Sequence, residues 1–564
     1  MEIDPIDLAI IVVYLIGIVA IGLVAGVRQR RVSGDKGYFL AGRTLTWPAI
    51  GLALFATNIS TLELVSLAEE GFKRGLLYGN TELMAPVTLI ILAMFFAPFY
   101  IQSGITTLPS FLEKRYSPAC RYWLVVFALG YGIFGHLGFA LFTGGKVVQG
   151  LFGIELIYGM AIILVLTGIY TIIGGLKAVV WTEAIQTVIL LGGMMVLGGI
   201  AYNKVGGWDS FTQALANEPE RLKLLRADEG AADLTWYAII LGYPVIGIWF
   251  WCTDQTIVQR MLGAKDQQHA QVGAIFAGFI KVAALFLFVL PGLFCYVLVQ
   301  QNVLPALPLN DTGEPDTART LSFMVAELLP IGMVGLVAAA MLSALMSTVA
   351  GALNSTATIC CHDIYKEIRP DASDRSMVYV GRVVTCIAVV AAIVFAPMIQ
   401  NFGSILEGNT TLLAYMAPSV TTVFLWGVFW RGASKTGALA CLAGGAVLGA
   451  ILCPLDLFKI WTVHDSFMMT SVYLFLLCSA VLVVFSRIYP QELTEESEKL
   501  VWSHPLAVLH EPGWRGVGNY KFLSVALMVL VILVFAIFQF EAHRIEAGAG
   551  QGIENQANEV SLVE

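Results

Sequence analysis

Three oxygen-bearing residues in the segment ALMSTVAGALNSTAT could bind a monovalent cation. Ala344, Ser347 and Thr348 are spaced by three and four positions, so in a helix they share one face. The Ala344 carbonyl and the two hydroxyls would then offer three neutral oxygens. Hard cations take oxygen ligands, and neutral ligands suit an ion that must both bind and leave. Alternatively, the hydroxyls only hold helices together or bond back to their own carbonyls.

A second stretch, residues 54–72 (LFATNISTLELVSLAEEGF), could complete that site. It begins as apolar sequence and then carries hydroxyl, amide and carboxyl side chains, among them Asn58, Ser60 and Glu63. Each carboxylate near a bilayer centre costs roughly 2.5–3.5 kcal/mol on insertion scales, so the stretch should face protein or water. We expect a membrane helix to unwind at ATNIS and to release two backbone carbonyls. The resulting five ligands would come from Ala56, Ile59, Ala344, Ser347 and Thr348.

Ionisable residues inside apolar segments form a second candidate set. Lys281 lies in GFIKVAALF, while Asp254 and Glu183 lie at the edges of other apolar segments. A lone lysine in a membrane is costly, so Lys281 should meet a carboxylate or a hydrogen-bonding solute. Glu63 and Glu82 are the two candidates for that carboxylate. The pair would contribute to solute recognition, or it would be a structural ion pair without solute contact.

Aromatic residues 249–251 (WFW) follow a stretch rich in glycine and proline. Such rings beside a polar cavity suit the apolar face of a sugar, and they equally suit plain packing.

The elements that must position these residues are membrane helices. Of the 564 residues, 58% are hydrophobic and 13% are charged, against about 25% charged in soluble domains, and the mean hydropathy is +0.79. The composition predicts an all-α polytopic membrane protein. Because a crossing needs about 20 mostly apolar residues, we predict about 14 spans, at 6–27, 46–71, 80–103, 122–150, 156–173, 182–202, 235–258, 270–298, 322–358, 376–398, 404–429, 434–454, 466–487 and 519–540.

Several functional classes are disfavoured by the sequence. With a net charge of −8, the chain lacks the excess of basic residues that is typical of nucleic-acid-binding proteins. No GxSxG, P-loop or HExxH motif is present, so we predict that the chain is not an enzyme. The nine cysteines show neither metal spacing nor a disulfide framework. No loop is long enough for a catalytic or signalling domain, and no obligatory protein partner is indicated.

Lysine and arginine placement predicts the orientation in the membrane. If the basic loop after the first helix is cytoplasmic, cytoplasmic loops hold about twice as many Lys and Arg residues as the opposite side. Both termini are then extracytoplasmic. We expect a multi-pass protein of the cell (plasma or inner) membrane.

Two predicted helices are interrupted, and they lie five helices apart. Span 46–71 is broken at ATNIS, and span 235–258 carries Gly242, Pro244 and Gly247. Five is odd, so the two broken helices enter from opposite sides. Paired interrupted helices of this kind point to an inverted repeat with a transport site near the midplane. Alternatively, Gly and Pro are simply frequent in membrane helices.

Seven stretches resemble the sodium/solute symporter family, and within it the sodium–glucose cotransporter branch. They are FLAGRTLTWPAIGLALFATNIS (39–60), TLPSFLEKRY (107–116), GGLKAVVWTEAIQ (174–186), WFWCTDQTIVQRML (249–262), GFIKVAALFLFVLPG (278–292), LNSTATICCHDIYKE (353–367) and VFLWGVFW (423–430).

The resemblance implies a LeuT-type inverted five-helix repeat with one extra N-terminal and three extra C-terminal helices. The expected divisions are 1–45 (first helix and basic cytoplasmic loop), 46–202 (first repeat), 203–234 (extracellular loop), 235–430 (second repeat), 431–487 (two peripheral helices), 488–518 (cytoplasmic loop) and 519–564 (last helix and acidic tail).

The resemblance also implies a function. The chain is expected to import a small polar organic solute, a monosaccharide first, together with sodium by alternating access. Its partners would be sodium, the solute and the lipid bilayer. A polyol such as inositol, an amino sugar, another organic solute, or a non-transporting solute sensor are the alternatives.

The family's main sodium site maps onto the same five residues that the oxygen chemistry selected. Among its sugar-contacting residues, the family's glutamate and lysine match Glu82 and Lys281. Its inner aromatic gate, usually a tyrosine, matches Phe250, which is followed by Trp251. The expected coupling residues are Asn58, Ser60, Glu183 and Asp254.

The chain departs from the family pattern at the solute site. Glu63 stands where sugar carriers have glutamine or histidine, and Thr410, flanked by Asn409, stands where they have a key glutamine. Gly247 stands at the position of an asparagine found in some bacterial members. We count Glu63, Asn409 and Thr410 among the expected solute-binding residues.

A second sodium site of some relatives uses an acid, here Glu183, and two hydroxyls. The hydroxyl positions here are Ala350 and Gly351, so we expect one sodium per solute.

Overall fold

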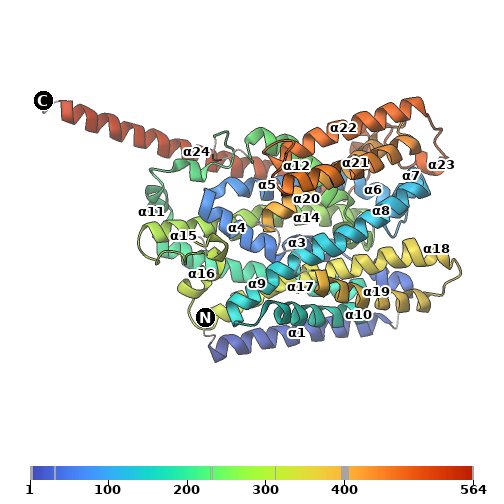
Figure 1. Cartoon of the computed structure of the whole chain (residues 1–564), viewed down its shortest axis with the longest axis horizontal. Helices are drawn as coiled ribbons and strands as arrows, with labels where there is room; N and C mark the ends of the chain where they lie inside the picture. The colour runs from blue at the N-terminus through green and yellow to red at the C-terminus, as the bar shows by residue number, and fades with distance from the viewer. Residues whose placement is uncertain are drawn as a thin grey trace.

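The computed structural model describes residues 4–30, 34–228, 230, 233–310, 313–395 and 405–561. Within these ranges the chain is built from helices (Figure 1), and the only β-type pairings are two isolated bridges. The all-α prediction is therefore confirmed. The end of the predicted span 376–398 and the start of span 404–429 lie outside the described residues.

The longer helices follow one another from end to end of the chain. They are α1 (Pro5–Arg30), α3 (Trp47–Asn58), α4 (Thr61–Arg74), α5 (Gly79–Ile91), α6 (Ala97–Gln102), α7 (Leu108–Arg115), α8 (Pro118–Tyr131), α9 (Ala140–Phe152), α10 (Leu156–Val205), α11 (Gly207–Ala214), α12 (Trp236–Ile248), α13 (Gln255–Leu262), α14 (Gln267–Ala284), α15 (Leu290–Gln300), α16 (Thr320–Leu328), α17 (Met333–Ile359), α19 (Asp374–Phe395), α20 (Ile405–Phe429), α21 (Lys435–Leu457), α22 (Phe467–Ile488) and α24 (Tyr520–Ser561).

Twelve helical stretches of the described chain are long and apolar enough to cross a membrane, against the 14 spans predicted. The two longest of the 12 are Thr61–Gln102 with 42 residues and Leu156–Val205 with 50, whereas about 20 residues span a bilayer. The longer one contains Gly175, whose φ of 59° and ψ of −161° are not helical. The difference thus arises where neighbouring helices run into one another, and the count of 14 stays a prediction.

The predicted break in the second helix is present. α3 ends at Asn58 and α4 begins at Thr61, and Ile59 and Ser60 between them have extended backbone angles. Ser60 caps α4, because its hydroxyl accepts a hydrogen bond from the Glu63 backbone N–H at 3.3 Å. This cap satisfies one of the N–H groups that the start of a helix leaves without an intrahelical partner.

The predicted position of the second break is wrong. α12 continues through Gly242, Pro244 and Gly247 without interruption. The chain leaves helical geometry only at Asp254 (φ −80°, ψ 126°), after a π-helical turn formed by residues 249–253. Glycine makes a helix easier to break but does not force a break. A capping aspartate starts a new helix, and the Asp254 side chain accepts from the Ile257 N–H at 3.2 Å.

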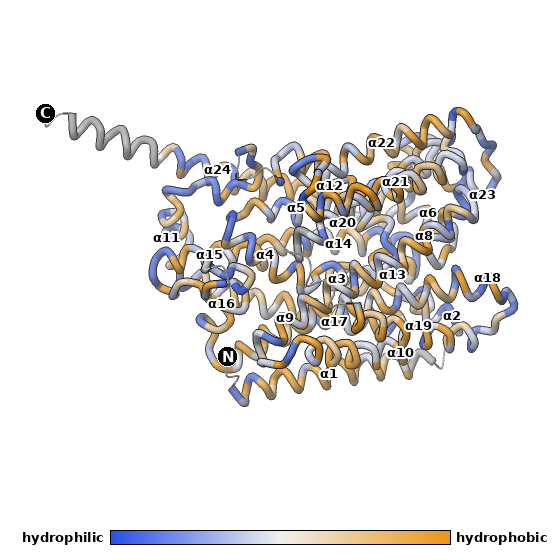
Figure 2. Tube along the Cα trace, viewed as in Figure 1, coloured by the Kyte–Doolittle hydropathy of each residue, from blue (hydrophilic) through white to orange (hydrophobic). Residues whose placement is uncertain are grey.

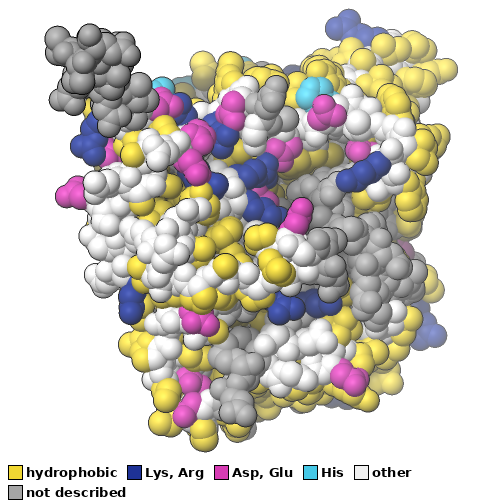
Figure 3. Space-filling view, turned by 60° about the vertical axis from the view of Figure 1, so that its left-hand side comes forward, with side chains coloured by type: hydrophobic (Ala, Val, Ile, Leu, Met, Phe, Trp, Pro, Cys, Tyr) yellow, Lys and Arg dark blue, Asp and Glu magenta, His cyan; other side chains and the backbone are white. Residues whose placement is uncertain are grey.

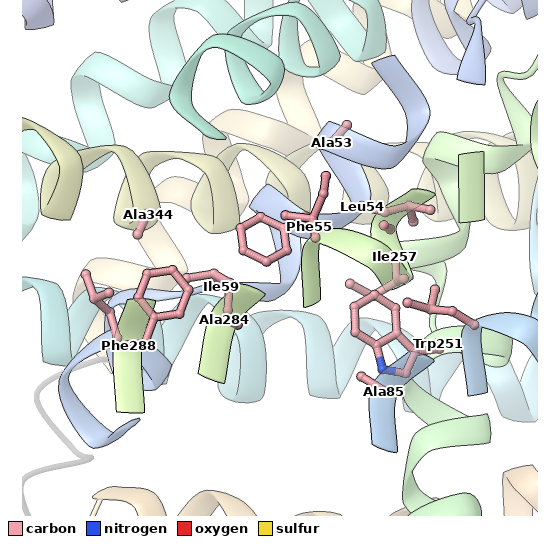
Figure 4. Close-up of a cluster of buried hydrophobic side chains, with 14 of the residues drawn as sticks. Ala53, Leu54, Phe55, Ile59, Ala85, Trp251, Ile257, Ala284, Phe288 and Ala344 are labelled. Atoms are coloured by element: carbon pink, nitrogen blue, oxygen red, sulfur yellow. The ribbon is translucent and has the colours of Figure 1, made fainter. Parts of the chain in front are cut away.

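α17 is the central helix of the bundle. In its span, Met333–Ile368, 89% of the most apolar 18-residue segment is buried inside the protein, whereas only 17% of the corresponding segment of α1 is buried. α17 packs against α10, α1, α3 and α13. Ala344 of α17 belongs to the same buried hydrophobic cluster as Phe55, Ile59 and Phe288 (Figure 4). The break between α3 and α4 is therefore held against the middle of α17.

Both ends of the chain emerge at the same end of the bundle. α1 starts there and α24 runs out there, beside α11, α15 and α16 (Figure 1). Hydrophobic residues follow the lengths of the helices, and hydrophilic residues concentrate at the helix ends (Figure 2). Termini on one side agree with an even number of crossings. The assignment of that side as extracytoplasmic, and the division into two repeats, stay predictions.

Candidate functional site

A cavity of about 160 Å³ lies beside the break between α3 and α4. All seven expected solute-binding residues line it, although they come from distant parts of the sequence. They are Glu63, Glu82, Phe250, Trp251, Lys281, Asn409 and Thr410. Asn58 and Ser60, expected as coupling residues, line the same cavity.

Lys281 is paired, as the cost of a lone membrane lysine requires. Its ammonium donates to the Glu82 carboxylate at 2.5 Å and to the Asn58 side-chain oxygen at 2.6 Å. The Asn58 amide in turn donates to Glu63 Oε1 at 3.1 Å. Glu82 and Lys281 are only 5% and 1% exposed. One hydrogen-bonded chain therefore runs from Glu82 through Lys281 and Asn58 to Glu63, along the cavity wall.

Glu63 lies at the end of this hydrogen-bonded chain, and only one of its two carboxylate oxygens takes part in it. Its Oε2 atom is buried and has no hydrogen-bond partner among the described residues. A glutamate three positions after a capping serine commonly reaches back to the serine N–H. Here the Ser60 N–H donates to the Asn58 carbonyl at 2.9 Å, and the Glu63 carboxylate also interacts with this N–H group.

The five expected sodium ligands lie at the contact between the helix break and α17. The Ser347 hydroxyl lies 2.7 Å from the Ala56 carbonyl oxygen and 3.0 Å from the Ala344 carbonyl oxygen, and its single hydrogen can be donated to either. The Thr348 hydroxyl lies 3.2 Å from the Ala344 carbonyl. Ile59 takes no part in these bonds, but it is fully buried in the same cluster as Ala344.

This arrangement can bind a cation by exchanging hydrogen bonds for ion contacts. A hydroxyl that donates to a carbonyl can rotate, so that its lone pairs and the carbonyl oxygen both face an ion. Ala56, Ala344, Ser347 and Thr348 are each no more than 3% exposed, so an ion there would be largely dehydrated. Thr348 also lines the cavity, so the expected ion ligands lie directly beside the cavity.

Glu183 does not reach the cavity. Its carboxylate pairs with the Arg260 guanidinium at 2.5 Å and accepts from the Thr57 hydroxyl at 3.1 Å, and both charged side chains are fully buried. The same guanidinium lies so close to Gly351 that a Cβ atom at this position would collide with it. The place where a second cation would need ligands is thus occupied by an arginine.

Asp254 connects the second break to a residue that the sequence analysis missed. Besides capping α13, its carboxylate lies 3.2 Å from His136 Nε2. His136 lines the cavity, as do Tyr131 and Tyr243. A single imidazole between Gly132, Gly135 and Gly138 in an apolar segment is the sequence signal that could have identified His136.

A second, larger cavity of about 590 Å³ lies next to the first, and its lining residues come from helix ends and loops, among them Arg74, Asp233 and Asp456. The two cavities share Tyr78, Thr410 and Phe467 in their walls. Figure 3, turned so that the end of the bundle with the termini comes forward, shows acidic and basic side chains gathered on that face. We call the larger cavity the vestibule.

Comparison with known proteins identifies what this arrangement is similar to. The model of the sodium:solute symporter family matches residues 38–445. The sodium/glucose cotransporter 4 of Danio rerio is 35% identical, over 79% of this chain and 71% of that protein. The sodium/myo-inositol cotransporter 2 of Mus musculus is also 35% identical, over 80% and 70% of the two chains.

The fold has a counterpart among solved structures. The structure of a Na⁺-coupled sialic acid symporter in a substrate-bound outward-open state superimposes with a TM-score of 0.76 and 21% sequence identity. The match covers 87% of this chain and 100% of that chain. At this level of identity the likeness concerns the fold alone.

Proposed function

The chain belongs to the sodium:solute symporter family, and we propose that it imports a small polar organic solute together with sodium by alternating access. The relatives are cotransporters by name, and sodium is their coupling ion. The curated relatives carry names of sugars and of inositol, so the solute proposed here is of monosaccharide size and bears several hydroxyl groups.

One observation carries the proposal: the helix break and α17 meet through oxygens directly beside the cavity. The Ser347 hydroxyl binds the Ala56 carbonyl at 2.7 Å, and Thr348 of the same helix face lines the cavity. We propose that sodium is bound here by Ala56, Ile59, Ala344, Ser347 and Thr348. The ion would join the break to α17 and so fix Asn58 and Glu63, which lie on either side of the break, in the cavity wall.

Coupling then follows from differential affinity. Sodium that binds better when the break is pressed against α17 shifts the population toward that state, which is also the state with an ordered solute cavity. The vestibule provides the outer access. Inward movement of one sodium ion releases about 2.3 kcal/mol per 100 mV of membrane potential, and its concentration gradient adds to this driving force.

In the proposed solute site, Glu82, Lys281 and Asn409 bind hydroxyl groups, and Trp251 and Phe250 cover an apolar face of the solute. Lys281 lies 5.9 Å from the centre of the Trp251 ring, so a ring-shaped solute can contact both. Phe250 packs edge-on against Trp251, with ring centres 5.2 Å apart. Since Phe250 has no hydroxyl, this side of the site is closed by packing rather than by a hydrogen bond.

We further propose a stoichiometry of one sodium per solute. At the place of a second ion, Arg260 already neutralises Glu183 at 2.5 Å, and Ala350 and Gly351 provide no hydroxyl. A cation next to a buried guanidinium would meet direct charge repulsion.

Transport by the purified protein in liposomes tests the proposal. An inward sodium gradient should drive accumulation of a radiolabelled sugar or polyol above its outside concentration, and an equal potassium gradient should not. A panel of sugars, polyols and amino acids in thermal-shift measurements, with and without sodium, selects the solute. Uptake that proceeds equally with potassium would contradict sodium coupling.

A further inference from the structure

The wall of the inner cavity carries more carboxylates than cations. Glu63 and Glu82 face it, and Lys281 is the one Lys or Arg side chain among its described lining residues. Lys281 is already bound by Glu82 at 2.5 Å and by Asn58 at 2.6 Å. The lysine charge is thus engaged by Glu82, and Glu63 lies at the far end of the hydrogen-bonded chain.

Glu63 makes few hydrogen bonds, and within the described part of the chain it forms no direct ion pair. Oε1 accepts one bond, from the Asn58 amide at 3.1 Å, and the buried Oε2 accepts none from the described residues. A buried carboxylate oxygen without a donor is costly, and buried polar atoms in native structures are nearly always paired. Because Glu63 lines the cavity, a turn of its carboxylate would let a bound solute supply the missing donor.

The vestibule shows the same imbalance. Its described wall holds four carboxylates and two basic side chains besides His464; the carboxylates are those of Glu70, Asp233, Asp456 and Asp465. Arg74, one of the two basic residues, is held between Glu70 at 2.6 Å and Asp233 at 2.7 Å. Walls of one sign concentrate solutes of the opposite charge. The route to Glu63 therefore favours cations.

The inner cavity is also lined by aromatic rings. Tyr131, Tyr243 and Trp251 line it together with Glu63. An ammonium group is attracted to the face of such rings, by about 0.5–2 kcal/mol depending on its hydration. The carboxylate and the rings together make a site for an organic solute that carries a positive charge on one group and hydroxyl groups at other positions.

We propose that the transported solute carries a protonated amino group next to its hydroxyl groups, as an amino sugar does, and that Glu63 binds that group through Oε2. The inference rests on the proposed symport function and specifies the solute class. The amino group would supply both the positive charge and the N–H donors that Glu63 lacks, while Glu82 and Lys281 remain available for hydroxyl groups.

Sodium-dependent uptake of matched sugars tests the inference. The probes are D-glucosamine, D-galactosamine and D-mannosamine, each with its neutral parent sugar and its N-acetyl derivative, at a pH at which the amines are protonated. N-acetylation keeps the nitrogen but removes the charge. We expect at least one amine to be preferred by about tenfold or more in kcat/KM over both neutral partners, as for a buried charge pair.

Two variants assign the preference to Glu63. Glu63→Gln keeps size and hydrogen-bonding capacity but removes the charge, and it should reduce the preference to about threefold or less, mainly through a higher KM for the amine. Glu69→Gln is the matched control: it lies on the same helix, lines neither cavity, and pairs with the half-exposed Lys73. It should leave the preference unchanged.

Three outcomes overturn the inference. Neutral parents that are transported as well as all amines would show that no charge is recognised, and the symport proposal would stand. An amine preference that survives in Glu63→Gln would place the recognition elsewhere. Absence of sodium-dependent uptake for every sugar, charged or neutral, would contradict the solute class together with this inference.

Discussion

Lys281 and Glu63 illustrate how single residues define the proposed solute site. A cation in the membrane interior requires a partner, and this requirement alone led from Lys281 to Glu63 or Glu82 as its counterpart. The structure selects Glu82 at 2.5 Å, and it connects Glu63 to the same network only through Asn58. The cost of an unpaired charge in the membrane thus predicted the candidate partners of Lys281, whereas the choice between Glu63 and Glu82 required the structure.

His136 and Arg260 mark the limit of prediction at this scale. Both are buried partners of residues that the sequence analysis named, Asp254 and Glu183. Each pair joins positions 77 or more residues apart, and no local pattern encodes such a distance. The residue types that require partners are readable from sequence, but the partners themselves depend on how the helices pack.

Removing one member of the Lys281–Glu82 pair should destabilise the protein more than removing both. Lys281→Met leaves the Glu82 carboxylate without its cation, and we expect a loss of about 3 kcal/mol in the free energy of unfolding. The double variant Lys281→Met with Glu82→Leu should regain most of this stability while losing solute binding. Chemical denaturation in detergent measures both.

Lys73→Met is the control for this comparison. Its pair with Glu69 is solvent-accessible, with Lys73 44% exposed, so we expect a change of about 0.5 kcal/mol or less. A double variant no more stable than Lys281→Met would show that the pair is not a coupled unit.

At the scale of secondary structure, the two interrupted helices were predictable to different degrees. The break after α3 falls where polar residues enter an apolar segment, and there Ser60 supplies its own cap. The second break was expected at Gly242, Pro244 and Gly247, but it occurs at Asp254. A residue that caps the next helix is a better indicator of a break than residues that merely tolerate one.

Ser60→Ala should weaken the start of α4. Loss of the hydroxyl that accepts from the Glu63 N–H at 3.3 Å should cost about 1 kcal/mol of stability. Because Glu63 lies in the first turn of α4, the same change should lower solute affinity more than sodium affinity. Ser60→Thr, which keeps a neutral hydroxyl that can cap α4, should restore stability in thermal unfolding. A Ser60→Ala protein with wild-type stability would contradict the role of this cap.

At the scale of the whole molecule, the bundle has one central helix, two broken helices against it and a vestibule on one side. Hydropathy predicted that the chain crosses the membrane many times, because each crossing needs its own apolar segment. It separated neighbouring spans less well, as Leu156–Val205 shows with 50 helical residues around one non-helical glycine. The cavity is lined by segments spread between residues 57 and 468. How these segments come together depends on helix packing, and the sequence could indicate it only through its resemblance to a known family.

The buried pair of Arg260 and Glu183 predicts one sodium ion per transport cycle. Arg260 beside Glu183 takes the place that a second ion would need. Reversal potentials or sodium and solute fluxes measured together in liposomes should therefore give a ratio of one, with a Hill coefficient for sodium near one. A ratio of two would contradict the assignment of Arg260.

The central claim is that sodium binds where the break between α3 and α4 meets α17, and sodium titration of solute uptake tests it most directly. Ser347→Ala and Thr348→Ala should each raise the sodium concentration for half-maximal uptake by about tenfold, the effect of about 1.4 kcal/mol of lost ion binding. Ser343→Ala removes a hydroxyl one turn away, which binds Tyr14 at 2.8 Å and not the expected ligands, and should titrate like the wild type. Uptake with wild-type sodium affinity in both Ser347→Ala and Thr348→Ala would contradict the account.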